Sequence, residues 1–143
     1  GGNMAEIYKK LTDYIPFIED DKFGEWIIDR ENDGTMEHPI QFPFVSYSEM
    51  VRKFERDVYE FMEEHPEYGL NRYGEILEQN HIEWGTKSMN EAKLDALDGK
   101  TIMALLMGAV RAERFCDGAL LGFFEDGAIS KWLKRLEEID KEG

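Results

Sequence analysis

The stretch TIMALLMGAVRAERF, residues 101–115, is the most apolar of the chain and decides the fold. Its apolar side chains recur at the three- and four-residue spacing of one helix face, widened by Met103 and Met107: Ile102, Leu105, Leu106, Ala109 and Val110. Asp98 has the side chain to cap this helix, and Gly118 can adopt the left-handed conformation that ends one. We therefore predict a buried central helix from Thr101 to Phe115.

A second strong helix is predicted in the first half of the chain. Ser46 followed by Glu49 has the spacing of a capping box, and an apolar stripe follows it: Val51, Phe54, Val58, Phe61 and Met62. Pro66 and Gly69 are expected to end this helix.

Shorter helices are predicted on both sides of these two. An N-terminal amphipathic helix should end or kink at Pro16. Asn71 and Ser88 have side chains that can cap two more helices, the second of them brief. After an Asp126-Gly127 turn, a final helix carries an apolar stripe: Ile129, Trp132, Leu133, Leu136 and Ile139.

A small β hairpin is predicted at residues 24–45. Ile40, Phe42 and Phe44 alternate with other residues after a turn at residues 32–34, and Pro39 and Pro43 restrict the second strand to a sheet edge. Residues 29–34 imitate the start of a calcium loop, but Ile40 stands where a bidentate Glu is needed, which favours a plain turn. The fold class is thus mainly α (α+β): one compact helical domain with a hairpin.

Composition limits the class of protein. The chain has 143 residues, which fits one domain, and 42% hydrophobic residues, which allow it to fold. Its 31 acidic and 17 basic side chains give a net charge of −14, so direct nucleic-acid binding is disfavoured.

Compartment and processing follow from a few residues. Cys116 is the only cysteine, which excludes an intramolecular disulfide, and no apolar run is long enough to span a membrane. We expect a cytoplasmic protein without a membrane anchor. Residues 1–3 resemble an expression-tag remnant, so a single domain over residues 4–143 is expected.

The charged cluster Arg111, Glu113, Arg114 and Asp117 follows the apolar helix. Arg111 and Arg114 are three residues apart and can share one helix face, so two guanidinium groups could bind a carboxylate or phosphate beside the aromatic rings of Trp26 and Phe44. The favoured alternative is an internal salt-bridge network, together with cations placed favourably at a helix C-terminus. Cys116 next to these cations is interpreted as packed rather than reactive.

Two further sets of residues have a functional and a structural interpretation. The hairpin aromatics could line a pocket or close the core: Phe23, Trp26, Phe42, Phe44 and Tyr47. An acidic helix could mimic nucleic-acid phosphates or be a solvated face, and its candidate partner-binding residues are Glu55, Glu60, Glu63 and Glu64. The three histidines lack a second ligand at zinc spacing, so neither a metal nor a cofactor is expected.

The chain resembles a known family in its C-terminal half. The segment RAERFCDG, residues 111–118, is followed by a second glycine at Gly127 and a WLKRL helix at residues 132–136. This pattern is similar to an uncharacterised family of bacterial and phage proteins, catalogued only as a domain of unknown function. The match is good over residues 97–140, and Glu83-Trp84 corresponds to an Asp-Trp pair of the family. The resemblance implies a shared fold and a prokaryotic or phage origin, and no activity.

Three functions are compatible with the sequence. Because a well-patterned core comes without a catalytic signature, the first is a non-enzymatic interaction or regulatory module that binds another protein. The second is a phage or mobile-element inhibitor whose acidic surface blocks a nucleic-acid-handling host enzyme. The third is a binder of a small anionic ligand, or an enzyme, that uses Arg111 and Arg114. The sequence leaves the oligomeric state open.

Overall fold

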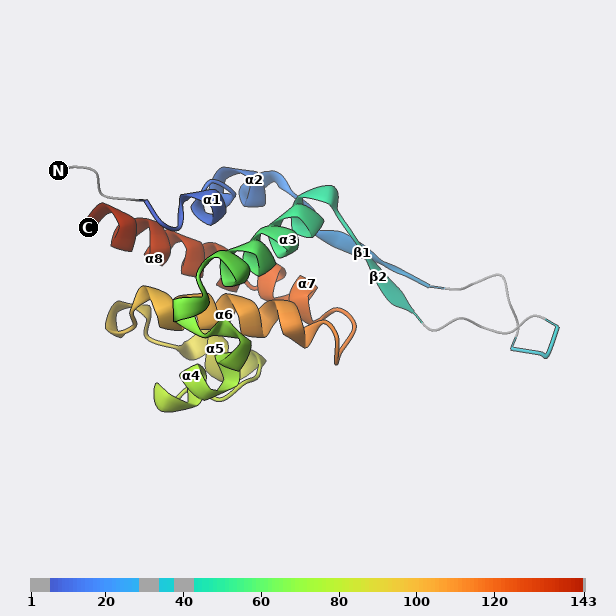
Figure 1. Ribbon diagram of the computed structural model, residues 1–143. Helices are drawn as coiled ribbons and strands as arrows, with labels where there is room; N and C mark the ends of the chain where they lie inside the picture. Colours follow the sequence, from blue (N-terminus) through green and yellow to red (C-terminus); the bar gives the residue numbers. More distant parts are fainter. Residues whose placement is uncertain (1–5, 29–33, 38–42, 143) are drawn as a thin grey trace.

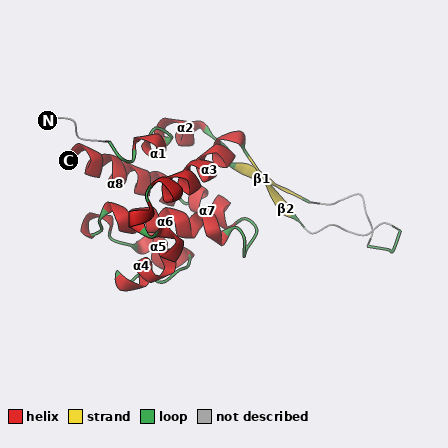
Figure 2. Ribbon diagram, in the orientation of Figure 1, coloured by secondary structure: helices red, strands yellow, loops and turns green. Residues whose placement is uncertain are grey.

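The structure is a computed structural model that describes residues 6–28, 34–37 and 43–142. It confirms a mainly α fold with a small β hairpin, in which the helices form one body and the two strands leave it at one end (Figures 1 and 2). The elements in chain order are α1 (Lys9–Thr12), α2 (Ile15–Asp20), β1 (Gly24–Ile27), β2 (Phe44–Tyr47), α3 (Glu49–Glu64), η1 (Pro66–Tyr68), η2 (Leu70–Arg72), α4 (Tyr73–Gln79), α5 (Thr86–Glu91), η3 (Leu94–Ala96), α6 (Gly99–Ala112), α7 (Ala119–Glu125) and α8 (Ala128–Glu142).

The predicted central helix is α6. Every residue from Thr101 to Val110 is buried, and α3, α4, α7 and α8 all pack against it. The start predicted at Asp98 is confirmed, since its carboxylate accepts hydrogen bonds from the Thr101 amide (2.9 Å) and hydroxyl (2.6 Å). The end is three residues earlier than predicted, because tighter turns at Arg114 and Phe115 replace the α-helical pattern after Ala112.

The second predicted helix is α3, and its apolar stripe Val51, Phe54, Val58 and Phe61 is buried. Its predicted cap was wrong. The Val51 amide donates to the hydroxyl of Ser48 (3.2 Å), whereas Ser46 lies in β2 opposite Glu25. Strand pairing holds the backbone extended through Tyr47, so the helix cannot begin earlier.

Three other local predictions were also wrong. Pro16 does not end a helix; it lies in the first turn of α2, where its missing N–H costs nothing. Asn71 lies within η2, and α4 begins only at Tyr73, without a side-chain cap. Ser88 lies inside α5 and its hydroxyl accepts from the Glu83 amide (2.8 Å), which closes the preceding loop.

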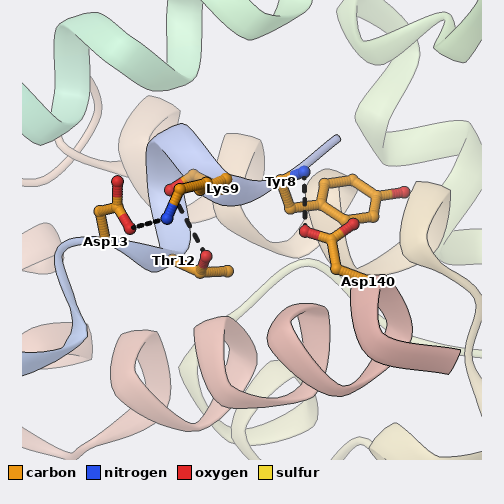
Figure 3. A network of polar contacts seen from close by, with 5 residues as sticks. All are labelled: Tyr8, Lys9, Thr12, Asp13 and Asp140. Atoms are coloured by element: carbon orange, nitrogen blue, oxygen red, sulfur yellow. Dashed lines mark hydrogen bonds and ion pairs between the residues drawn. The ribbon is translucent and has the colours of Figure 1, made fainter. Parts of the chain in front are cut away.

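The two ends of the described chain are joined. The Tyr8 amide, just before α1, donates to the Asp140 carboxylate on the last turns of α8 (3.0 Å; Figure 3). The Tyr8 ring is buried, and its hydroxyl lies 2.8 Å from that of Tyr68. Gly99 leaves room for that ring, since a Cβ at this position would lie 2.0 Å from the Tyr8 hydroxyl. The start of α6 and the chain ends therefore pack as one unit.

The described part of the hairpin has two distinct faces. Trp26 lies opposite Val45, and Ile27 lies opposite Phe44. Because side chains alternate along a strand, the first pair faces one way and the second pair faces the other. Most of the predicted turn and the first part of the predicted second strand, including Phe42, lie outside the described residues, as does most of the calcium-like segment.

Candidate functional site

The site begins at Glu113, immediately after α6. Its carboxylate accepts hydrogen bonds from the Tyr47 hydroxyl, from the Gly118 amide (3.0 Å) and from the Leu120 amide (3.0 Å). The Tyr47 oxygen in turn accepts from the Leu121 amide (3.0 Å). These contacts satisfy donors at the start of α7 and join the hairpin to both helices.

The surroundings of Tyr47 favour the protonated form of its hydroxyl group. Burial, followed by the hydrogen bond to the Glu113 carboxylate, raises the pKa of the Tyr47 hydroxyl well above its usual range. The hydroxyl therefore stays protonated at physiological pH and donates a hydrogen bond to the Glu113 carboxylate.

Trp26 packs on the turn between α6 and α7. A Cβ at Gly118 would lie 2.4 Å from the indole Cζ2 atom, and Gly118 has a φ of +90°. Only glycine meets both conditions. The indole is nevertheless 47% exposed, so one side of it covers the turn and the rest meets solvent.

Arg111 and Arg114 share one aromatic ring. The Arg111 guanidinium carbon lies 5.7 Å from the centroid of the Tyr59 ring on α3, and that of Arg114 lies 5.9 Å from it. In the part of the chain that the structure describes, neither arginine is within ion-pair distance of a carboxylate, and the buried Nε of Arg111 has no hydrogen-bond acceptor. The salt-bridge network of the favoured sequence interpretation is therefore absent among the described residues, whereas Arg111 does lie in the last turn of α6, where a cation is favourable.

The comparisons with known proteins identify the family. The family of unknown function DUF6508 matches residues 3–142. The chain belongs to DUF6508. The suspected resemblance is thus confirmed, and the match extends well beyond the C-terminal segment that carried it. Neither the search of curated proteins nor the search of solved structures found a match.

In the DUF6508 chain, Glu55 lies close enough to Glu113 and Arg114 to interact with their charges. It is half-buried on α3, and desolvation, followed by the nearby charge of Glu113, raises the pKa of its carboxyl group. The positive charges of Arg114 and Arg52 act in the opposite direction. The effect of burial is the larger one, and Glu55 forms no ion pair with either arginine.

The other predicted acidic residues of α3 do not form one free face. Lys10 pairs with both Asp57 and Glu60, and the Tyr14 hydroxyl donates to Asp57 (2.6 Å). Glu63 and Glu64 are exposed on the last turn. The predicted partner-binding set therefore comprises one half-buried residue, one paired residue and two solvated ones.

The hairpin aromatics divide by role. Phe23 stacks on Phe124 (5.1 Å between centroids) and Tyr47 packs against the core, as the core-closing interpretation expects. Phe44 is 46% exposed on the face opposite Trp26. The structure therefore places Trp26 beside the 113–118 turn with the charged cluster and leaves Phe44 away from it.

Three aromatic residues near the site were not predicted. The Tyr59 ring makes cation–π contacts with the guanidinium groups of both Arg111 and Arg114. The Trp84 indole donates a hydrogen bond to the Gly108 carbonyl (3.1 Å). Phe115 is 74% exposed and packs edge-on against Trp84 (5.6 Å). The sequence signal for Trp84 is Gly108 inside an apolar helix, where a Cβ would lie 3.3 Å from the indole.

The remaining candidates for reactive or metal-binding residues do not form a site among the described residues. Cys116 is exposed, so its interpretation as a packed residue was wrong; it lies in the turn after α6 rather than on its buried face. In the described ranges no three His, Cys, Asp or Glu side chains could together hold a metal ion, and no helix could cross a membrane. Asp117 is exposed beside Cys116.

Gly118 and Gly127 form a matched pair for testing the Trp26 contact. Both have positive φ, +90° and +80°, but a Cβ at Gly127 would meet no atom within 4 Å. Gly127→Ala should therefore lose only the backbone strain, about 1–2 kcal/mol, whereas Gly118→Ala should lose more. In a Trp26→Ala background the two losses should become similar when measured by urea unfolding. Equal losses in the wild-type background would show that the indole does not pack on Gly118.

Glu55→Gln tests the electrostatics of the cluster. Because the folded-state pKa of Glu55 is raised, its protonated form contributes stability that is complete below the unfolded-state pKa, near 4.5, and is lost as the pH rises through the folded-state pKa. Since Gln stays neutral, the stability advantage of the variant over wild type should grow over that window and then level off.

Urea unfolding of wild type and Glu55→Gln between pH 4 and pH 8, at intervals of about one pH unit, checks this prediction. Glu63→Gln, which removes a charge from the exposed end of α3, is the matched control. An advantage that shrinks as the pH rises would contradict the burial of Glu55.

Proposed function

We propose that this chain is a non-enzymatic protein-binding module whose contact surface is the outer face of the hairpin. The observation that carries the proposal is the cross-strand pair Ile27 and Phe44, which is 37% and 46% exposed on the face turned away from Trp26. A directly opposed apolar pair on a two-stranded sheet needs a covering layer. No described element of the chain provides it.

The position of the hairpin supports a role in contact with another protein. The strands project from the helical body (Figure 1). On one face of the hairpin, Tyr47 accepts from the Leu121 amide and Trp26 lies over Gly118. Because Tyr47 is hydrogen-bonded at the base, the hairpin is held in one direction before any partner binds. Such preorganisation lowers the entropic cost of association.

The charge of the hairpin indicates what kind of surface it binds. Its described residues include Glu25 and Glu37 and no lysine or arginine, within a chain of net charge −14. A complementary partner is a protein with an apolar patch surrounded by basic residues. Nucleic-acid-handling enzymes are one class with such surfaces, which keeps an inhibitory role among the outcomes of the test.

The contact differs from the one expected on α3. Glu55 is half-buried and Glu60 is paired with Lys10, so the acidic helix offers little continuous free surface. Its exposed end at Glu63 and Glu64 adds to the overall negative charge that would steer a basic partner.

Binding measurements with surface variants test the proposal. A protein partner is first isolated by cross-linking capture, and its affinity is then measured for wild type, Ile27→Ser, Phe44→Ser and the control Phe17→Ser. Phe17 is 63% exposed on α2, so it matches the loss of apolar surface at another place. We expect the hairpin variants to bind at least about tenfold more weakly, with unfolding curves unchanged, and the association rate to fall with added salt.

Three results would reject this surface or this partner class. Unchanged affinity in both hairpin variants would exclude the outer face as the contact. Self-association that Phe44→Ser abolishes would make the occupant a second copy of the chain instead. An association rate insensitive to salt would exclude a basic partner.

A further inference from the structure

A pair of cations without counter-charges is unusual in a chain with 31 acidic side chains. Arg111 and Arg114 lie over the same Tyr59 ring, so both guanidinium groups are within about 6 Å of one point. Among the described residues neither of them has an ion-pair partner. Arg111 is also partly buried, with its Nε left without an acceptor.

The nearest carboxylates are engaged elsewhere. Glu113, between the two arginines in sequence, accepts from Tyr47 and from two amides at the start of α7. Glu55 is close enough to interact electrostatically with Arg114, but the two side chains form no ion pair, and burial raises the pKa of the Glu55 carboxyl group. Neither arginine therefore has a carboxylate in direct contact within the described part of the chain.

The chemistry of guanidinium groups limits the kinds of ligand that would bind to Arg111 and Arg114. Guanidinium groups present planar N–H forks that bind phosphate and carboxylate oxygens bidentately. Two guanidinium groups at one aromatic ring carry two positive charges, which match a phosphate dianion better than a single carboxylate. The C-terminal end of α6 opposes an anion with only about half a negative charge, so the arginines prevail.

We propose that Arg111 and Arg114, held on the ring of Tyr59, bind the phosphate group of a small molecule. The terminal guanidinium nitrogens are the contacting atoms, since the Arg111 Nε is buried. Arg52, whose charge reaches Glu55 from α3, adds a third positive charge near the site. This inference is independent of the proposed hairpin contact, because it uses a different surface.

The role of Tyr59 is to position the guanidinium groups. A cation over an aromatic face is attracted by the negative charge of that face, and more strongly when it is desolvated. Two arginines on one ring lose part of their rotamer freedom before the ligand arrives, so less is lost on binding. The phenol hydroxyl is not required, and Phe at this position should serve as well.

Titration calorimetry with inorganic phosphate tests the site, with sodium chloride at equal ionic strength as the blank. We expect saturable binding to wild type and at least a tenfold loss of affinity in Arg114→Gln and Arg111→Gln. Arg56→Gln is the matched control, since it removes one positive charge from α3 and the guanidinium groups over Tyr59 are those of Arg111 and Arg114. It should bind phosphate like wild type.

Further variants separate binding from folding. Arg114 is exposed, so Arg114→Gln should remain folded, with only the small loss of stability that its contact with Tyr59 supplies, and stay informative if Arg111→Gln unfolds. Tyr59→Leu should weaken phosphate binding and Tyr59→Phe should restore it. A phosphomonoester such as phenyl phosphate, compared with phosphate, shows whether the ligand is the free ion or an organic phosphate, since the second should bind more tightly if an organic body is recognised.

Two results would overturn the proposal. Heats no larger than those of chloride at equal ionic strength would mean that no phosphate site exists. Saturable binding that survives in Arg114→Gln as it does in Arg56→Gln would place the phosphate elsewhere.

Discussion

The hydrogen bond from the Tyr47 hydroxyl to the Glu113 carboxylate is the contact on which the functional half of this structure depends. It joins the last residue of β2 to the residue that follows α6, across 66 positions of sequence. A part-buried carboxylate needs several donors, and here it has a phenol and two backbone amides of the turn into α7. The same group therefore sets the direction of the hairpin and begins a helix.

Two surfaces follow from this one contact. On one side it brings Trp26 onto Gly118 and leaves Ile27 and Phe44 facing outward, which creates an apolar acidic hairpin for a partner. On the other side it removes Glu113 from Arg111 and Arg114, which then share only the ring of Tyr59. A carboxylate that could have formed the predicted salt-bridge network stabilises the chain path instead.

The parts predicted correctly from sequence are those governed by local periodicity. The buried face of α6 and its Asp98 cap depend on neighbours three or four residues away, and both were predicted. The cap of α3 was not, because Ser46 and Ser48 are both plausible caps and only pairing with β1 decides between them. Pro16 was ambiguous for a similar reason, since proline is typical both after one helix and at the start of another.

In the candidate site, too, local spacing could be used for prediction, whereas contacts between distant elements could not be predicted. The three-residue spacing of Arg111 and Arg114 predicted that their guanidinium groups could share one helix face, and in the structure their guanidinium carbons lie 5.7 and 5.9 Å from the centroid of the Tyr59 ring. Tyr59 could not be predicted as the neighbour of these arginines, nor Tyr47 as the partner of Glu113, since both contacts arise from packing between elements far apart in sequence. The exposure of Cys116 and Phe115 was missed because the helix was expected to continue to Phe115.

The most direct test of the account is a double-mutant cycle of Tyr47→Phe and Glu113→Gln, followed by urea unfolding. If the pair acts as one unit, the double variant should lose less stability than the two single losses together, with a coupling energy of about 1.5–3 kcal/mol for a hydrogen bond to a charged group. Additive losses, with no coupling between the two positions, would contradict the claim that this contact organises the hairpin and α7.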